Sequence, residues 1–257
     1  MATMSAATHV ENDKPPIDTN TLTRGEKKEL IAADAISVNS TTFGTPDLSF
    51  APAKSLHINA KGIPILGFAA PPAELVTRVH NFDGSVAYTS TRAKRSSGSC
   101  VLTDADGMTL ISTKYFCGTK DPVLNRLDAS EGIPKEIKTV SKWTSRSHEF
   151  LLPDGRTCAW TYRKEKGFGT NGAKGNALVL MLGEKRIAVL VRNDDTRTSG
   201  SNSYSAGNGG ELVLGEDVGG NHGIDEALIV ATILLMLKKE IDRRRTVQVA
   251  ITASAGS

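Results

Sequence analysis

Four cationic side chains stand around a glycine-rich run in the second half of the chain. Arg163, Lys164 and Lys166 lie at its start and Lys174 near its end, in the sequence KGFGTNGAKG that closes with Gly175. The backbone N–H groups of such a loop, together with ammonium and guanidinium groups, suit phosphates or lipid headgroups. The alternative, and the commoner role of such runs, is a solvated set of charges with no ligand.

The same run contains the pattern G-x-G-x-x-G at Gly167, Gly169 and Gly172. In dinucleotide-binding folds this pattern lies between a strand and a helix whose N-terminus holds the phosphates. Here β-prone residues follow the run, at 177–182. We therefore predict a flexible hairpin loop and no bound dinucleotide.

Two more groups of cations lie outside this run. Arg92, Lys94 and Arg95 form a basic turn, which we predict as a second contact for lipid or phosphate groups. The other group consists of Lys238, Lys239 and three arginines at 243–245. Cations favour the negative C-terminal end of a helix, so the helix dipole explains that group without a ligand.

Residues of the types that hold metals do not form a recognisable pattern. The histidines show no spacing, with one another or with cysteine, that would place ligands on one helix face; they are His9, His57, His80, His148 and His222. Asp104 and Asp106 belong to a turn, because no acidic loop with a terminal glutamate follows them, as calcium binding requires. We therefore predict no bound metal.

The cysteines also favour a structural role. Cys100, Cys117 and Cys158 are odd in number and widely spaced, which fits free reduced thiols better than disulfides or zinc ligands. No family signature of a cysteine nucleophile surrounds them, and the sequence has no serine elbow, Walker loop or zincin motif. We predict a non-enzymatic protein without a cofactor.

Composition and charge limit the functional classes. The protein has 257 residues, 39% of them hydrophobic, which suits one soluble globular core. Residues 1–50 carry 4 Lys or Arg and 7 Asp or Glu, which leaves 27 and 21 for the remainder, a net charge of +6. That excess favours anionic surfaces slightly, but it is too small for a dedicated nucleic-acid binder. The N-terminus lacks an apolar secretory signal, so we predict a cytoplasmic protein.

The most distinctive segment is a predicted C-terminal helix over residues 224–245. Between residues 227 and 237 its only polar side chain is Thr232, whose hydroxyl we expect to bond to the backbone one turn earlier. This apolar stretch rises about 17 Å, against roughly 30 Å of bilayer hydrocarbon, so we predict no transmembrane span. A helix that is apolar on all sides must be buried on all sides.

Strands and tight turns are predicted before this helix. Asp-Gly pairs at Asp83, Asp106 and Asp154 are hairpin signals. The predicted hairpins cover residues 100–113, residues 149–162 with Cys158, Trp160 and Tyr162 on one face, and residues 177–191. The last should be central, since both of its arms are apolar on both faces. Shorter strands are predicted at 56–58, 85–90 and 211–214, the last after a polar loop over 194–210.

These predictions combine into a mainly β fold with one buried helix: an antiparallel closed β-barrel that encloses the hydrophobic C-terminal helix. Closing the sheet around the helix buries the apolar faces of both. Residues 53–245 would form this barrel. Residues 1–52, rich in small polar residues and proline, would be a disordered arm with one short helix at 23–36. Residues 246–257 would be a tail that is disordered or adds an edge strand at 246–252.

In this arrangement the protein resembles the tubby-like superfamily, and most of all its fungal members of unknown function. The resemblance rests on VAYTS, CVLTDADGMTLIS, EFLLPDGRTCAWTY and KRIAVLVRN, followed by DEALIVATILLMLKKEIDRRR. It covers residues 55–245 and implies a barrel threaded by a hydrophobic helix. Because tubby domains bind phosphoinositides through basic surface residues, the resemblance also implies binding of phospholipid headgroups.

We therefore predict a tubby-like barrel whose basic loops bind anionic phospholipid headgroups, phosphoinositides among them, at the periphery of a membrane. The residues concerned are Arg163, Lys164, Lys166, Lys174, Arg92, Lys94 and Arg95. One alternative is a protein-interaction module that uses the N-terminal arm or the loop at 194–210. Another is a scramblase-like lipid transporter, which would require the helix to enter the bilayer.

Overall fold

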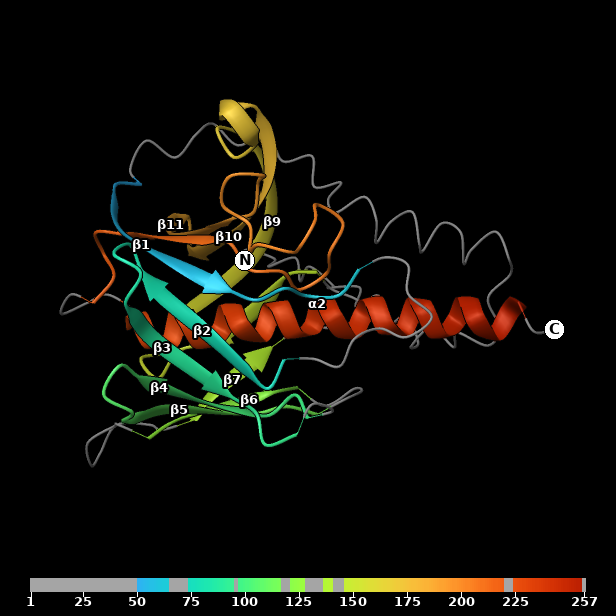
Figure 1. The fold of residues 1–257 in the computed structure, drawn as a ribbon. Coiled ribbons are helices and arrows are strands. Elements are labelled where there is room, and N and C mark those ends of the chain that lie inside the picture. The colour runs from blue at the N-terminus through green and yellow to red at the C-terminus, as the bar shows by residue number, and fades with distance from the viewer. Residues whose placement is uncertain are drawn as a thin grey trace, which may run out of the picture.

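Antiparallel strands close into a barrel around a long helix, α2 (Glu226–Ala255), in the computed structural model (Figure 1). It describes residues 50–64, 74–94, 97–116, 121–127, 136–140, 146–219 and 224–255, with side chains to residue 251. The predicted fold class, a closed antiparallel β-barrel that encloses a hydrophobic helix, is confirmed. The predicted arm before Phe50, with its short helix at 23–36, lies outside the described residues.

Each strand pairs with the next in sequence, and β12 closes the ring by pairing with β1. The strands are β1 (Pro52–Asn59), β2 (Val76–Asn81), β3 (Val86–Thr91), β4 (Cys100–Asp104), β5 (Thr109–Lys114), β6 (Val123–Arg126), β7 (Glu136–Val140), β8 (His148–Leu151), β9 (Thr157–Lys166), β10 (Lys174–Leu182), β11 (Lys185–Val191) and β12 (Glu211–Gly215). Because directions alternate, the turns that follow even-numbered strands lie at the entry end, where α2 begins. The turns that follow odd-numbered strands lie at the exit end, where α2 leaves the barrel.

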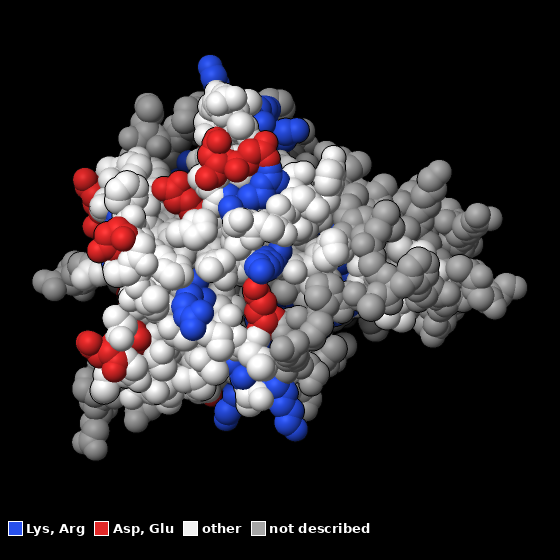
Figure 2. All heavy atoms as spheres, viewed as in Figure 1, with Lys and Arg blue, Asp and Glu red and all other residues white. Residues whose placement is uncertain are grey.

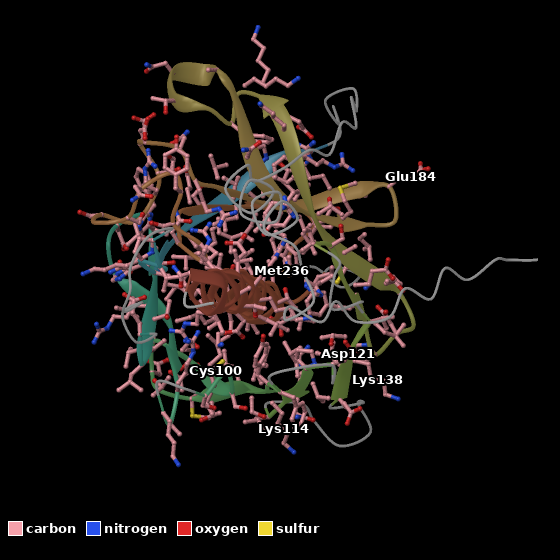
Figure 3. All side chains as sticks on the ribbon, turned by 90° about the vertical axis from the view of Figure 1, so that its right-hand side faces the viewer. Cys100, Lys114, Asp121, Lys138, Glu184 and Met236 are labelled. Atoms are coloured by element: carbon pink, nitrogen blue, oxygen red, sulfur yellow. The ribbon has the colours of Figure 1, made fainter. Side chains whose placement is uncertain are left out.

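The first half of α2 fills the barrel. Every residue from Ala227 to Lys238 is buried, and the apolar ones pack against the inward side chains of the strands. Full burial of each leucine or isoleucine contributes about 1.5–3 kcal/mol. The Thr232 hydroxyl donates to Ile229 O at 2.9 Å, as predicted, and accepts a hydrogen bond from Trp160 Nε1 at 3.0 Å. Viewed from the exit end, the helix lies within the ring of strands (Figure 3).

Carboxylates hold the first turn of α2 at the entry end. The Asp225 side chain accepts a hydrogen bond from Ala227 N at 2.9 Å, the pattern of an N-cap. Asp225 also pairs with Arg126, and Glu226 pairs with Lys54 at 2.7 Å. The predicted helix start and its charges are therefore confirmed.

The end of the helix differs from the prediction. Residues 246–252 were predicted as a disordered tail or an edge strand, but α2 continues without a break to Ala255. Val247 and Ala250 are both buried, which is the i, i+3 spacing of a helix face. At 1.5 Å per residue the whole helix measures about 45 Å, and its last turns project beyond the strands (Figure 1).

The greater length of α2 also corrects the prediction that the helix dipole explains the cations at 238–239 and 243–245. The cations Lys238, Lys239 and residues 243–245 were assigned to the helix C-terminus, yet the last turn contains no basic residue. The dipole effect is confined to the terminal turn, so it does not explain three arginines that end ten residues earlier. Arg243 and Arg244 instead lie where α2 leaves the barrel.

The predicted hairpins are confirmed in their positions. β4 and β5 flank Asp104–Gly107, β8 and β9 flank the Asp154–Gly155 turn, and β10 and β11 meet around Gly183. The β10–β11 hairpin is buried on both faces, as predicted. Its outer face carries a second apolar cluster, of Ala177, Val179, Met181, Val189 and Val191, against which Phe50 and Phe168 pack.

Three strands had no counterpart in the prediction, namely β2, β6 and β7. β6 has four residues, and β7 has only Ile137 and Thr139 on its buried face. Short strands with few apolar side chains carry a weak periodic signal. The sequence alone therefore underestimates how many strands surround the helix.

Candidate anion-binding site at the helix exit

A pocket of about 240 Å³ opens at the exit end, between the β9–β10 hairpin, the β11–β12 loop (residues 192–210) and α2. Gly169, Thr170 and Asn176 contribute from the hairpin, and Glu240 and Arg243 from the helix. Arg146, from the segment before β8, completes the lining, so four separate segments meet at the pocket. Figure 3 shows the molecule from this end.

Arginine dominates the lining of this pocket. Its charged residues are the cations Arg146, Arg192, Arg197, Arg243 and Arg244 and the carboxylates Asp194 and Glu240. Five cations and two anions give the lining a formal charge of +3. A guanidinium presents several N–H donors in a planar fork that matches phosphate or carboxylate oxygens. The lining is therefore suited to an anion.

Glu240 and Arg192 form the floor of the pocket. Two parallel hydrogen bonds of 2.8 and 3.0 Å join the guanidinium to the carboxylate, which also accepts from Gly207 N at 2.8 Å and from the Tyr162 hydroxyl. Burial opposes ionisation of Glu240, but Arg192 and these donors hold the pKa of the carboxyl below its ordinary value. Burial and Glu240 raise the pKa of Tyr162. These hydrogen bonds hold the side chains of Glu240, Arg192 and Tyr162 in place, so the cluster forms a fixed floor for the pocket.

A second ion pair closes one side of the pocket. Arg197 pairs with Asp194, and Asp194 Oδ2 accepts a hydrogen bond from Thr170 Oγ1 at 3.0 Å. This contact ties the β9–β10 hairpin to the β11–β12 loop. Both carboxylates of the lining are thus engaged by its own arginines. Arg243, in contrast, forms no hydrogen bond or ion pair among the residues that the structure describes.

The predicted lysines Lys164, Lys166 and Lys174 share one face of the β9–β10 hairpin. Inward residues of β9 alternate from Cys158 through Trp160 and Tyr162, so Lys164 and Lys166 continue that face. Lys174 lies directly opposite Lys166, and Asn176, which lines the pocket, lies opposite Lys164. We call Lys164, Lys166 and Lys174 the lysine face. All three side chains are exposed; they do not line the pocket themselves, but their strand neighbours Gly175 and Asn176 do.

Arg163 does not belong to the lysine face. It lies on the opposite side of β9, where Glu165 is 3.9 Å away and also pairs with Arg186 at 2.9 Å. The four cations predicted around the glycine-rich run are therefore divided between the two faces of the β9–β10 hairpin. Alternation along a strand separates neighbours in sequence onto opposite faces.

The basic turn around Arg92 lies on the other side of the barrel. Its strand, β3, is six strands from β9 in either direction around the ring. Arg92 Nη1 donates to Glu74 O at 3.4 Å, and Lys94 is exposed. Arg95 lies outside the described residues. The structure therefore places Arg92 and Lys94 at the exit end but not beside the pocket.

Sequence reasoning missed the arginines of the pocket. Arg146, Arg192 and Arg197 come from two separate loops, and no spacing connects them. Arg243 and Arg244 were assigned to a helix end that lies further on. The run after Arg245 is uncharged but alternates like a strand, so the sequence carries little signal that the arginines lie inside the helix.

Two buried titratable groups of the barrel are Cys158, near the entry end of β9, and His148, near the exit end of β8. Burial raises the pKa of the Cys158 thiol to about 12, which disfavours the reactive thiolate. His148 is buried beside Lys239, with 2.9 Å between His148 Nδ1 and Lys239 Nζ. Among the described residues, no group of three His, Cys, Asp or Glu side chains is arranged to hold a metal ion.

No protein-family model matches this sequence, and no match was found among curated proteins or solved structures. The tubby-like resemblance thus stays a prediction. No helix in the described part has both the length and the apolar character that crossing a membrane would take.

Proposed function

We propose that the exit end binds anionic phospholipid headgroups at a membrane surface. The observation that carries this proposal is the lysine face beside a pocket with five arginines and two engaged carboxylates. In this arrangement the pocket receives a headgroup phosphate, and Lys164, Lys166 and Lys174 contact the surrounding anionic surface. Each lysine or arginine near such a surface contributes about 1 kcal/mol.

The distribution of charge around the barrel supports this orientation. Turns at the entry end carry Asp83, Asp104, Asp106 and Glu184, none of which forms an ion pair with another described residue. Figure 2 shows acidic side chains along the left-hand end, where α2 begins. An anionic surface would repel this end and attract the opposite one.

Exposed apolar side chains lie at both ends of the barrel, with Phe82 (96% exposed) and Met108 (66% exposed) in entry-end turns, so charge rather than apolar exposure favours the exit end. At the exit end, Tyr204, in the β11–β12 loop, is 59% exposed, and Val140, at the end of β7, is 56% exposed. Phe116 follows β5 at the same end and is 43% exposed. Aromatic and apolar residues combined with cations are typical of surfaces that lie on a bilayer.

Vesicle sedimentation tests the proposal. The protein should sediment with vesicles of phosphatidylcholine that contain an anionic phosphoinositide and remain in solution with phosphatidylcholine alone. A phosphatidylserine arm distinguishes general anionic attraction from headgroup recognition. Equal binding to all three vesicles, or to none, would overturn the proposal.

Substitutions on opposite sides of the barrel locate the contact. Replacing Lys164, Lys166 and Lys174 with Glu removes three contacts of about 1 kcal/mol each, so binding should weaken by at least about a hundredfold. The matched control is Arg92→Glu with Lys94→Glu, which changes charge at the same end but far from the pocket. Because these two cations also lie at the end that faces the surface, the control should weaken binding as well, but less than the three lysine substitutions do. If both variants lose binding equally, the pocket is not the contact.

The alternative of a protein-interaction module concerns the β11–β12 loop. Thr198 Oγ1 donates to Ile58 O at 2.9 Å and accepts from Ala60 N at 3.1 Å, and Ala206 bridges Ile63. The loop is thus held onto the segment after β1, while Tyr204 remains exposed for a partner. A partner bound through Tyr204 should survive the three lysine substitutions, whereas lipid binding should not.

The scramblase-like alternative requires the apolar part of α2 to enter the bilayer. That part is enclosed by the strands, so entry would require the barrel to open. Protection of α2 from protease by vesicles would support this alternative, and its absence would remove it.

A further inference from the structure

Two Asn-Gly pairs occur in the sequence, Asn171–Gly172 and Asn208–Gly209, and the structure places them in opposite environments. Both residues of the first pair are exposed, at the tip of the β9–β10 hairpin beside the lysine face. Asn208 is 4% exposed, in the β11–β12 loop, where it lines the pocket. The same dipeptide therefore occurs once on the surface and once in the interior.

Asn-Gly is the dipeptide in which asparagine deamidates most readily, because glycine has no side chain to hinder the reaction. The backbone nitrogen of the glycine attacks the carbonyl carbon of the asparagine amide and forms a new bond between these two atoms. The bond from that carbon to the amide nitrogen breaks, and the amide leaves as ammonia with the proton from the glycine nitrogen. Water then opens the cyclic imide at either carbonyl, which yields aspartate or isoaspartate and leaves a carboxylate.

The surroundings of Asn171 permit this reaction. Asn171 has φ 56° and is the one non-glycine residue with a left-handed backbone among those that the structure describes. Gly172 has φ +73°, and a Cβ built on it would meet nothing within 4 Å. The short turn Thr170–Gly172 that contains both contributes no buried residue. Backbone hydrogen bonds from Ala173 N to Thr170 O and from Gly167 N to Gly172 O, both of 3.2 Å, close this turn, but Gly172 N, the atom that would attack, donates no hydrogen bond among the described residues.

The surroundings of Asn208 prevent it. Gly209 N, the atom that would attack, donates a hydrogen bond to Ala60 O at 2.7 Å. Arg192 Nη1 donates to Asn208 Oδ1 at 3.4 Å, which holds the side-chain amide in place. A Cβ on Gly209 would lie 1.9 Å from Ile58 O, so the backbone is closely packed and has no space to rearrange.

We propose that Asn171 is a site of spontaneous deamidation in the folded protein, whereas Asn208 is protected. Conversion of Asn171 adds a negative charge at the tip of the hairpin that carries Lys164, Lys166 and Lys174. This second step rests on the proposed function: the new carboxylate weakens attachment of the exit end to an anionic surface. The affinity of the protein for an anionic membrane surface would thus fall as more copies deamidate with time.

Peptide mapping by mass spectrometry tests the first step without reference to any ligand. Full-length protein is kept at mildly alkaline pH, folded in one arm and unfolded in denaturant in the other. In the folded arm the peptide with Asn171 should gain one mass unit, and the peptide with Asn208 should not. In the unfolded arm both peptides should convert at comparable rates. Equal conversion of the two sites in the folded arm, or resistance of Asn171 there, would overturn the proposal.

Two variants test the consequence for binding. Asn171→Asp should bind vesicles with an anionic phosphoinositide about fivefold more weakly than wild type, the effect of one unit of charge near the surface. Asn171→Gln, which keeps the amide but forms a cyclic imide far more slowly, should keep its affinity on storage. If Asn171 deamidates and Asn171→Asp binds like wild type, the regulatory step is wrong. If wild type binds no vesicle, the proposed function fails, while the mass measurement still decides the modification.

Discussion

Trp160 and Thr232 connect the wall of the barrel to the helix inside it: the indole Nε1 donates to the Thr232 hydroxyl at 3.0 Å. Both residues are fully buried, with exposures of 0% and 1%. Thr232 is the only polar residue in the buried part of α2 between Ala227 and Leu237. Within this stretch it is the one directional contact with the wall, and together with the polar contacts of Asp225 and Glu240 towards the two ends it sets the rotation and depth of the helix.

Replacing Thr232 with Val removes that acceptor while it keeps the shape of the residue. The buried indole N–H would be left without a partner, at a cost of about 1–3 kcal/mol in the free energy of unfolding. Urea unfolding followed by tryptophan fluorescence measures the change. The matched control is Thr246→Val, on the part of α2 outside the barrel, which should change stability much less. Equal losses in the two variants would show that the bond to Trp160 contributes nothing specific.

Glu240 should contribute stability that depends on pH. Its pKa is lower in the folded protein, so its contribution is present above the unfolded pKa of about 4.3 and is lost as the pH falls through the folded value. Glu240→Gln should lower the free energy of unfolding at neutral pH by about 3–5 kcal/mol, because Arg192 would stay buried without its counter-ion. It should also flatten the acid limb of the stability profile.

The exposed pair of Asp154 with Arg156 is the control for this prediction. Asp154→Asn should change stability by about 0–1 kcal/mol, as for other surface ion pairs. Urea unfolding of both variants at a series of pH values makes the comparison. If Glu240→Gln lowers the free energy of unfolding no more than Asp154→Asn does, Glu240 and Arg192 do not form a fixed floor of the pocket.

His148 should act over a different pH range. Burial, with help from Lys239 and Arg243, lowers the pKa of its imidazole to about 3. A neutral imidazole in the folded protein contributes fully above the unfolded pKa of about 6.5, and the contribution is lost as the pH falls from there towards 3. Wild type should therefore lose about 2 kcal/mol from this group between pH 6.5 and 5.

The variant His148→Gln should not show this loss, because glutamine does not titrate. Urea unfolding at pH 7 and pH 5 measures the difference for both proteins. An equal drop in wild type and variant would mean that His148 becomes protonated without cost in the folded state.

The fold could be predicted because its strongest signals are local. Asp-Gly turns mark the hairpins, and the apolar run of α2 requires enclosure on every side. β6 and β7 were not predicted because each has only a few inward side chains, too few for a recognisable alternation in the sequence. Their neighbours in the closed barrel bury these side chains. Ring closure between β1 and β12 is a property of the whole sheet that no short segment carries.

The site was harder to predict because its residues meet only in the folded protein. Lys164, Lys166 and Lys174 are close in sequence, and the hairpin places them on one face. Arg146 and Arg192 reach the pocket from different loops. Arg243 was misassigned because an alternating pattern, TVQVAIT, was interpreted as strand, which ended the predicted helix too early.

Two neighbouring valines can decide whether that alternating segment is a helix in solution. Val247 and Val249 would share one face of a strand, because strand side chains alternate with a period of two, but they lie on nearly opposite faces of a helix. In the structure Val247 is 9% exposed and Val249 is 66% exposed. Val247→Asp should therefore cost at least about 2 kcal/mol by burying an unpaired charge, whereas Val249→Asp should stay within about 0.5 kcal/mol. In thermal unfolding, the first change corresponds to a drop of roughly 4–8 °C in Tm. Equal effects of the two substitutions would contradict a helix that continues past the arginines, and with it the placement of Arg243 at the mouth of the barrel.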